Sequence, residues 1–294
     1  MKSSATPGSQ PPPSHSEAFR FVNELAQALS RGKVELPAIP DVAVKVRRAL
    51  EDDKVSAERL ERIVSAEPVL ATRIVQLANS AALNLSGNKV NDLRSAIARV
   101  GFSMVRTTSM AFALAQLRKG AELRGLEVQL GVLWRRSTMV AAMARVVSVR
   151  ISRVNPDTAM FAGLLHGIGE LYILTRIGAY PLLANTEEGK GIVRDWHGSI
   201  AKAVLENWDI DPLIQDAVAD FATYDREHVG PVDLTDVLTV SFLLASYTSH
   251  PESLELNMAD VGVCRKLQLA QADYQQLMDE SSEQIDALRE ALDF

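Results

Sequence analysis

The spacing of apolar residues constrains the fold of this chain most strongly, because that spacing follows the α-helical period almost throughout. In residues 41–50, the apolar side chains that share one helical face are Val42, Val46, Ala49 and Leu50. The alternation of apolar and polar residues that is typical of strands is almost missing, and so are turn dipeptides between runs of Val or Thr. The sequence therefore predicts an all-α fold.

Local signals indicate where several helices begin and end. Ser56 is suited to cap a short helix, and Pro68 is suited to begin the next one, because a proline at the first helical position loses no hydrogen bond. A further helix is expected from about Asp92 to Val100. Gly101 should end it, because glycine tolerates the left-handed conformation common after helices.

Two longer helices are predicted at residues 131–150 and 157–174. The second is apolar nearly all round, so it should run through the middle of a helical bundle. Gly163 and Gly167 lie on one face of it, and each glycine costs about 1 kcal/mol relative to alanine inside a helix. We therefore expect a neighbouring helix to approach closely at these two glycines.

Composition sets the expected environment. Residues 1–17 are rich in Pro, Ser and Gly and predict a disordered leader. The single Cys264 can form no internal disulfide, which favours a reducing compartment, and we expect a cytoplasmic protein. No run reaches the roughly 18 apolar residues of a membrane span, so no membrane contact is expected.

Charge is distributed unevenly within the net charge of −6. Residues 1–150 carry 22 Lys and Arg against 13 Asp and Glu, whereas residues 151–294 carry 9 against 24. In one interpretation the two halves attract each other or the charges lie on solvated helix faces; in the other, the basic half binds an anionic partner, either nucleic acid or cyclic di-GMP. The candidate contacts for such a partner are Lys45, Arg47, Arg48, Arg59, Arg62, Arg94, Arg99 and Arg106.

The sequence offers little for catalysis. A hydrolytic metal centre needs several imidazoles and carboxylates around one ion, but His166 is followed by Gly167 and has only Glu170 as a nearby acid. Phosphate-binding glycine loops and a G-x-S-x-G elbow are absent from the sequence. We therefore interpret His166 as a buried, hydrogen-bonded histidine, and no cofactor is expected.

Asn79 and Ser80 follow an apolar helical stripe that ends at Leu77. Both residue types suit a helix C-cap and turn, which is the commoner structural role. A functional role is the alternative, because polar connections held by rigid helices are places where partners bind.

Five segments, taken in order, resemble HDOD domains. They begin with "LPAIPDVAVKVRRAL" at residues 36–50 and "AEPVLATRIVQLANSAAL" at 66–83, and continue at 94–114, 133–148 and 161–174. The resemblance spans about residues 36–250 and implies a bacterial signalling module distantly related to HD phosphohydrolases. It implies an N-terminal helical subdomain over residues 18–122, an HD-like helical subdomain over 123–250 and a C-terminal tail over 251–294.

The resemblance also implies that the HD ligand set is degenerate. The position of the preceding histidine corresponds to Arg136, the His-Asp pair reads His166-Gly167, and the distal aspartate is replaced by Ser241 or its neighbours. Glu170 stands where active relatives often have a lysine. We therefore predict that the chain is not an enzyme and regulates signalling proteins through protein contacts, with a link to cyclic-dinucleotide signalling; a residual metal phosphohydrolase is the least favoured alternative.

Overall fold

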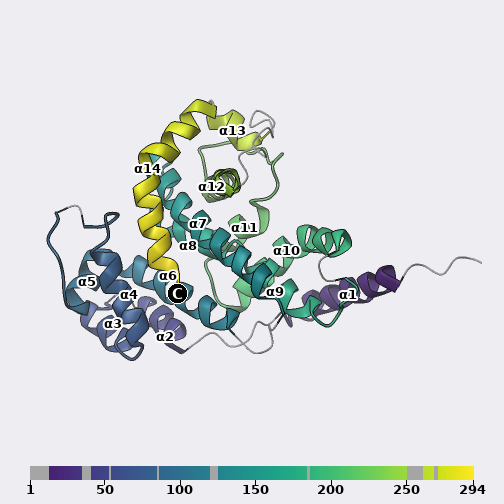
Figure 1. Ribbon diagram of the computed structural model, residues 1–294, viewed down its shortest axis with the longest axis horizontal. Helices are drawn as coiled ribbons and strands as arrows, with labels where there is room; N and C mark the ends of the chain where they lie inside the picture. The colour runs from purple at the N-terminus through teal and green to yellow at the C-terminus, as the bar shows by residue number, and fades with distance from the viewer. Residues whose placement is uncertain are drawn as a thin grey trace, which may run out of the picture.

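The computed structural model describes residues 13–34, 41–52, 54–84, 86–119, 125–183, 186–249, 261–267 and 271–294. Within these ranges every regular element is a helix, which confirms the predicted all-α fold (Figure 1). The first six helices are α1 (Pro13–Ser30), α2 (Asp41–Leu50), α3 (Ala57–Val64), α4 (Pro68–Ala78), α5 (Leu93–Val100) and α6 (Phe102–Arg118). The others are α7 (Glu127–Ile151), α8 (Pro156–Leu165), α9 (Ile168–Ile177), α10 (Glu187–Asn207), α11 (Pro212–Asp220), α12 (Leu234–Ser249), α13 (Gly262–Leu267) and α14 (Gln271–Leu292).

Helices α2 to α5 form one group, at the lower left of Figure 1. Side-chain caps shape their ends: the hydroxyl of Ser56, the predicted cap, accepts a hydrogen bond from the Arg59 backbone N–H at 3.2 Å, and Asp92, the expected start of a helix, accepts one from Ser95 N–H at 2.8 Å. Pro68 begins α4, and Gly101 follows α5 with a φ of 83°. These boundaries confirm the sequence prediction. They could be predicted because each rests on a local rule for helix ends.

Helix α7 forms the centre of the second group and packs against α8, α12 and α14. A Cβ atom added at Gly163 would lie 2.7 Å from Ala141 Cα, and one at Gly167 would lie 2.6 Å from Leu133 Cδ1. Both glycines therefore let α8 and the following turn approach α7 closely, as predicted. The predicted single helix over residues 157–174 is instead divided into α8 and α9 by a turn at His166 and Gly167.

Helix α6 joins the two groups. It packs against α2, α4 and α5 on one side and against α8 and α14 on the other. Eleven of its 17 residues are buried, from Met104 to Ala115. A helix buried on nearly all sides must lie between packed neighbours, so α6 belongs to the core of both groups.

Helix α1 packs against α10, on the far side of the molecule from α2 to α5 (Figure 1). The Tyr180 hydroxyl donates to Glu24 at 2.5 Å, and the Phe21 and Tyr180 rings lie 5.1 Å apart. The amphipathic α1 therefore buries its apolar face against the group that contains α10. Of the predicted leader, residues 1–12 lie outside the described residues, and α1 begins within the leader at Pro13.

Helix α14 lies along α7 and also contacts α4 and α6. Arg73 of α4 donates to the carbonyl oxygens of Glu290 and Asp293, and the Trp134 indole N–H donates to the Asp293 carboxylate at 2.7 Å. The predicted tail therefore packs across both groups of helices.

One segment in the described ranges, Pro156–Ile177, has the length and hydropathy of a membrane span, and 78% of its most apolar window is buried inside the protein. This burial identifies it as the central core segment, in agreement with the position predicted for residues 157–174.

Candidate functional site

A cavity of about 500 Å³ lies between α7, α9 and α10, beside the turn at His166 and Gly167 that separates α8 from α9. Each helix turns one face towards it, because the lining residues recur at helical spacing. Helix α7 contributes Val128, Gln129, Val132 and Arg136. Helix α10 contributes Lys190, Val193, Arg194 and His197. Three positions of the HD comparison, Arg136, His166 and Gly167, therefore line one cavity.

Arg136 and Glu170 form an ion pair inside this cavity. The guanidinium of Arg136, on α7, donates a hydrogen bond to the Glu170 carboxylate, on α9. The two side chains are about 30% and 27% exposed, so water screens their attraction only in part. Arg136 and Glu170, which the resemblance predicts in place of a histidine and a lysine, therefore neutralise each other's charge.

His166 lies at the inner wall of the cavity and is 2% exposed. Its Nδ1 lies 2.7 Å from the Gly163 carbonyl oxygen, and because a carbonyl only accepts, Nδ1 carries the proton. Nε2 is therefore an acceptor, and it has no hydrogen-bond partner among the described residues. Burial, assisted by the charge of Arg136, lowers the pKa of His166 to about 3, so the ring is neutral at physiological pH.

The aromatic surroundings of His166 explain part of this burial. The His166 ring makes edge contacts with Phe221 and Phe242, at centroid distances of 5.5 and 5.6 Å. His197 lies 5.6 Å from Phe221, and burial lowers its pKa as well. Both histidines are thus held in the neutral form by an apolar environment.

The distal position of the HD comparison provides no metal ligand. The Ser241 hydroxyl donates to the Val237 carbonyl oxygen at 2.6 Å and is fully buried in α12, away from the cavity lining. Its neighbour Phe242 lines the cavity instead, with the Arg136 guanidinium 5.8 Å from its ring centroid. Among the described residues, Glu170 is the one carboxylate in the lining, and it is already paired with Arg136. In the same part of the chain, His166, His197 and Glu170 do not form a group whose ligand atoms lie close enough together to share one ion.

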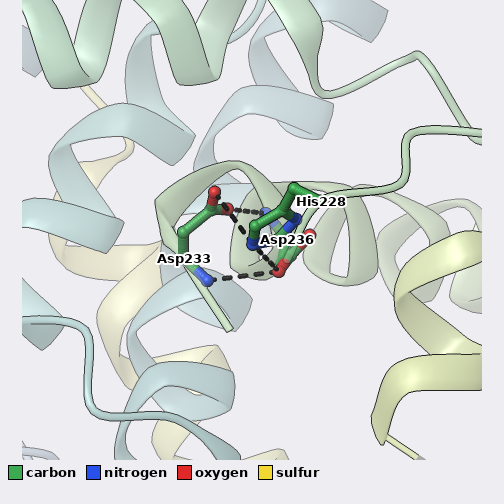
Figure 2. A group of neighbouring side chains, drawn as sticks. All are labelled: His228, Asp233 and Asp236. Carbon is green, nitrogen blue, oxygen red and sulfur yellow. Dashed lines mark hydrogen bonds and ion pairs between the residues drawn. The ribbon is translucent and has the colours of Figure 1, made fainter. Parts of the chain in front are cut away.

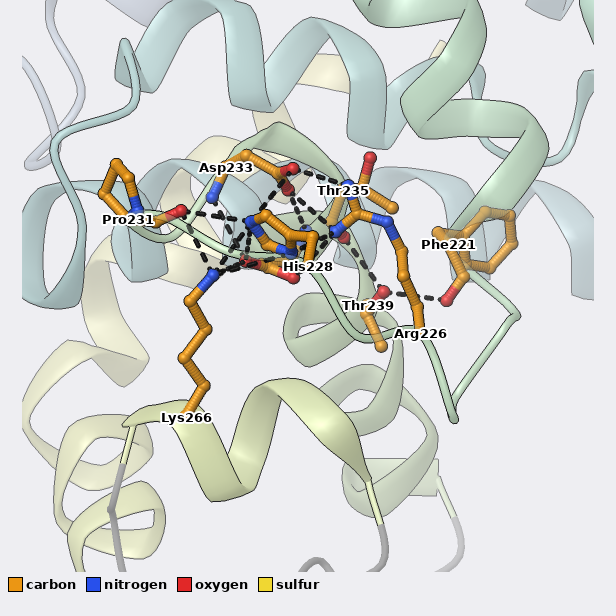
Figure 3. Close-up of polar contacts among 9 residues, drawn as sticks. Phe221, Arg226, His228, Pro231, Asp233, Thr235, Thr239 and Lys266 are labelled. Carbon is orange, nitrogen blue, oxygen red and sulfur yellow. Dashed lines mark hydrogen bonds and ion pairs between the residues drawn. The ribbon is translucent and has the colours of Figure 1, made fainter.

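A second cluster of metal-ligating residue types lies away from the cavity. Single atoms of His228, Asp233 and Asp236 lie within 4.8 Å of one another at the beginning of α12 (Figure 2). Two cations already occupy their carboxylates: Arg226 contacts Asp233 at 2.6 Å and Asp236 at 3.0 Å, and Lys266 of α13 contacts Asp236 at 3.3 Å (Figure 3).

The cluster is therefore an ion-pair network that ties the chain before α12 to α13. Burial is the largest single effect on Asp233 and raises its pKa, but the hydrogen bond and charge of Arg226, together with the Asp236 backbone N–H and the charge of His228, lower the pKa of that carboxyl overall. This network was not predicted from the sequence. Lys266 is 30 residues from Asp236 along the chain, and His228 stands in a polar, turn-like segment.

Most of the basic residues predicted to face an anionic partner contact other residues of the same chain. Four of them contact carboxylates: Lys45 with Asp41, Arg47 with Glu51 and Asp209, Arg59 with Asp52, and Arg94 with Glu58. Arg99 donates to the carbonyl oxygens of Ala78 and Asn88, and Arg106 lies 4.3 Å from the centroid of the Phe161 ring. Arg48 and Arg62 are exposed on α2 and α3.

Asn79 and Ser80 form the C-terminal cap of α4 and the turn after it. The Asn79 side chain donates to the Val90 carbonyl oxygen at 2.7 Å and accepts from the Val90 N–H at 2.9 Å, as a neighbouring strand would. The Ser80 hydroxyl donates to the Leu77 carbonyl oxygen at 2.7 Å. The commoner of the two interpretations, a C-cap and turn, agrees with these contacts.

Known proteins share this architecture. Over 221 residues the chain is 23% identical to an uncharacterized protein of Treponema pallidum (strain Nichols), a match that covers 69% of this chain and 40% of that protein. A candidate metal-dependent phosphohydrolase of Shewanella amazonensis SB2B is similar in structure, with a TM-score of 0.71, 23% identity, and coverage of 95% of this chain and 100% of that one. A candidate signal transduction protein of Marinobacter aquaeolei VT8 gives a TM-score of 0.61 at 18% identity, covering 95% and 66%.

The fold and the cavity together define an all-helical domain with an HD-like fold, in which Arg136, His166 and Gly167 line one cavity. The family model of the HDOD domain matches residues 36–223. The chain belongs to the HDOD domain family, which confirms the resemblance seen in the sequence.

Proposed function

We propose that this chain is a noncatalytic signalling module that acts through contacts with other proteins. The observation that carries this proposal is the Arg136–Glu170 ion pair in the cavity. A guanidinium stays charged at all physiological pH values and repels a metal cation at the place where an HD enzyme would hold one. The one carboxylate that the described residues place in the lining, Glu170, is bound to this guanidinium.

The signalling part of the proposal rests on similarity. Membership of the HDOD family supports it. The structural similarity to the signal transduction candidate of Marinobacter aquaeolei VT8, at 18% identity, concerns the fold alone. The similarity to a phosphohydrolase candidate supports the alternative of a residual enzyme, but at 23% identity it concerns the fold alone. The ion pair of Arg136 with Glu170 in the cavity favours the noncatalytic alternative.

The noncatalytic part is tested by metal content and hydrolysis. We expect elemental analysis of the purified full chain to find no stoichiometric Mn, Fe, Zn or Ni, and we expect no hydrolysis of phosphomonoesters, phosphodiesters or nucleoside triphosphates. Gly167→Asp alone should restore neither, because Arg136 remains. One metal per chain, together with activity that a chelator abolishes, would overturn the proposal.

The protein-contact part is tested by cross-linking in native cells, followed by capture of the full chain and mass spectrometry. We expect proteins that make, degrade or sense nucleotide second messengers to be enriched over a matched control bait. A failure to enrich any protein in cross-linked cells would contradict this part.

Binding of nucleic acid or cyclic di-GMP by the basic half is the second candidate. It has weaker support, because Arg47 is mostly buried and paired with Asp209, Arg99 donates to two backbone carbonyl oxygens, and Arg106 is half-buried against Phe161. The pairs of Lys45, Arg59 and Arg94 with carboxylates are exposed and therefore weak. A phosphate would have to compete with these intramolecular partners.

A further inference from the structure

We propose that the cavity between α7, α9 and α10 binds a small organic anion with an apolar, aromatic body and one N–H or O–H donor. The ligand would place its donor on His166 Nε2 and its anionic group near Lys190 and Arg194. This inference goes beyond the proposed function and rests only on its noncatalytic part.

The size of the cavity suits a small molecule. Its volume of about 500 Å³ falls within the range of about 300–1,000 Å³ that is usual for ligand sites. The cavity runs from the inner wall at His166 to an opening beside Val128 and Val132, which are exposed on α7. A ligand can therefore enter from solvent and still reach the buried histidine.

The walls favour an apolar body with a flat face. Val132, Leu174 and Val193 line the cavity from three different helices. Phe221 and Phe242 lie beside each other, with ring centroids 5.0 Å apart, and both line the cavity next to His166. Such rings bind aromatic groups by edge and offset contacts.

His166 determines that the ligand must donate the hydrogen bond between them. Because Nδ1 is protonated and bound to the Gly163 carbonyl oxygen, Nε2 can only accept, and it has no partner within the described part of the chain. Arg136 Nε is a second buried atom at the cavity without a partner there, and it is a donor. A buried polar atom without a partner is costly, so a ligand that supplies a donor to His166 gains an interaction that the protein lacks.

The charges favour an anion. The lining contains three permanent cations, Arg136, Lys190 and Arg194, against one carboxylate, Glu170, and its two histidines are neutral. Arg136 is paired with Glu170, which leaves the charges of Lys190 and Arg194 near the opening. These two side chains contact Glu187 and Asp195 at the surface, but such exposed pairs are weak and exchange readily.

Three fluorescent probes of one shape test the three parts of the proposal. The first is 2-anilinonaphthalene-6-sulfonate, which has two aromatic groups, a sulfonate and one N–H. The second is its N-methyl derivative, which lacks the donor, and the third is N-phenyl-2-naphthylamine, which lacks the sulfonate. We expect the first to bind the full chain saturably with one probe per chain, and each of the others to bind about 10-fold more weakly, because each loses one interaction in a partly buried site.

Variants then locate the binding. Val132→Trp, at a position on the cavity that is 48% exposed, should block the first probe, whereas Val149→Trp, at a position on the same helix that is 57% exposed and outside the lining, should not. Arg194→Gln should weaken the sulfonated probes and leave the unsulfonated one unchanged. Lys202→Gln, elsewhere on α10, is its control. Val193→Trp is the second blocking variant, and near-ultraviolet circular dichroism establishes that each variant is folded.

Each outcome separates the alternatives. Equal binding of all three probes, or binding unaffected by Val132→Trp and Val193→Trp, would overturn the ligand assignment while leaving the proposed function intact. Binding that requires an added divalent metal and disappears with EDTA would instead contradict the noncatalytic proposal.

Discussion

The neutral state of His166 should make the stability of the protein depend on pH in a specific way. The native pKa of about 3 lies well below the ordinary histidine value of about 6.5, so in acid the unfolded chain binds a proton that the native chain does not. The free energy of unfolding should therefore fall as the pH decreases from about 6.5 towards 3. For one such group the linkage relation gives a loss of about 2 kcal/mol between about pH 7.5 and pH 5.

The assay is urea unfolding followed by tryptophan fluorescence, at intervals across that pH range. The matched variant is His166→Asn, because an asparagine amide can replace Nδ1–H as the donor to the Gly163 carbonyl oxygen but does not titrate. Other groups, including His197 and the carboxylates, remain in both proteins, so the difference between the two curves reports His166. Parallel curves for parent and variant would refute the reasoning and show that His166 is accessible to protons in the native state.

Three further predictions concern packing, the α4 cap and the basic half. Gly163→Ala should lower the free energy of unfolding by about 1–3 kcal/mol because its Cβ would meet the Ala141 backbone, whereas Gly178→Ala, with open space around the added atom, should be neutral or stabilising; equal effects in urea unfolding would contradict the close approach. Asn79→Ala should cost about 1–3 kcal/mol through the loss of both hydrogen bonds to Val90, measured by thermal unfolding against Ser80→Ala, which loses one. Titration of labelled duplex DNA, single-stranded DNA and cyclic di-GMP into the full chain should show no saturable binding at physiological salt; tight binding that one or two arginine substitutions abolish would favour the anion-binding alternative.

The features that could be predicted from the sequence are those that depend on residues close together in the chain. The cap at Ser56, the helix starts at Pro68 and about Asp92, and the end at Gly101 follow from local backbone rules, and they agree with the structure. The close approach at Gly163 was also predictable, because a glycine inside an apolar helix costs free energy unless a neighbour requires the space.

Features that depend on packing between distant residues could not be predicted. Arg136 and Glu170 are 34 residues apart, and only the meeting of α7 with α9 makes them an ion pair. The cavity itself needs faces of three helices. Helical spacing can place Lys190, Val193 and His197 on one face of α10, but it does not show which helices this face meets. At the distal HD position, the rotation of α12 decides that Phe242 and not Ser241 faces the cavity, and residue types alone do not fix that rotation.

Helix α6 has a consequence for how the molecule unfolds. Because its side chains fill the core of both helical groups, neither group can lose its structure without exposing part of α6 to water. The two groups should therefore behave as one cooperative unit, with the amide hydrogens of Met104 to Ala115 among the slowest to exchange. A ligand or partner that strengthens either group then protects the other against local opening, with no movement of the backbone required.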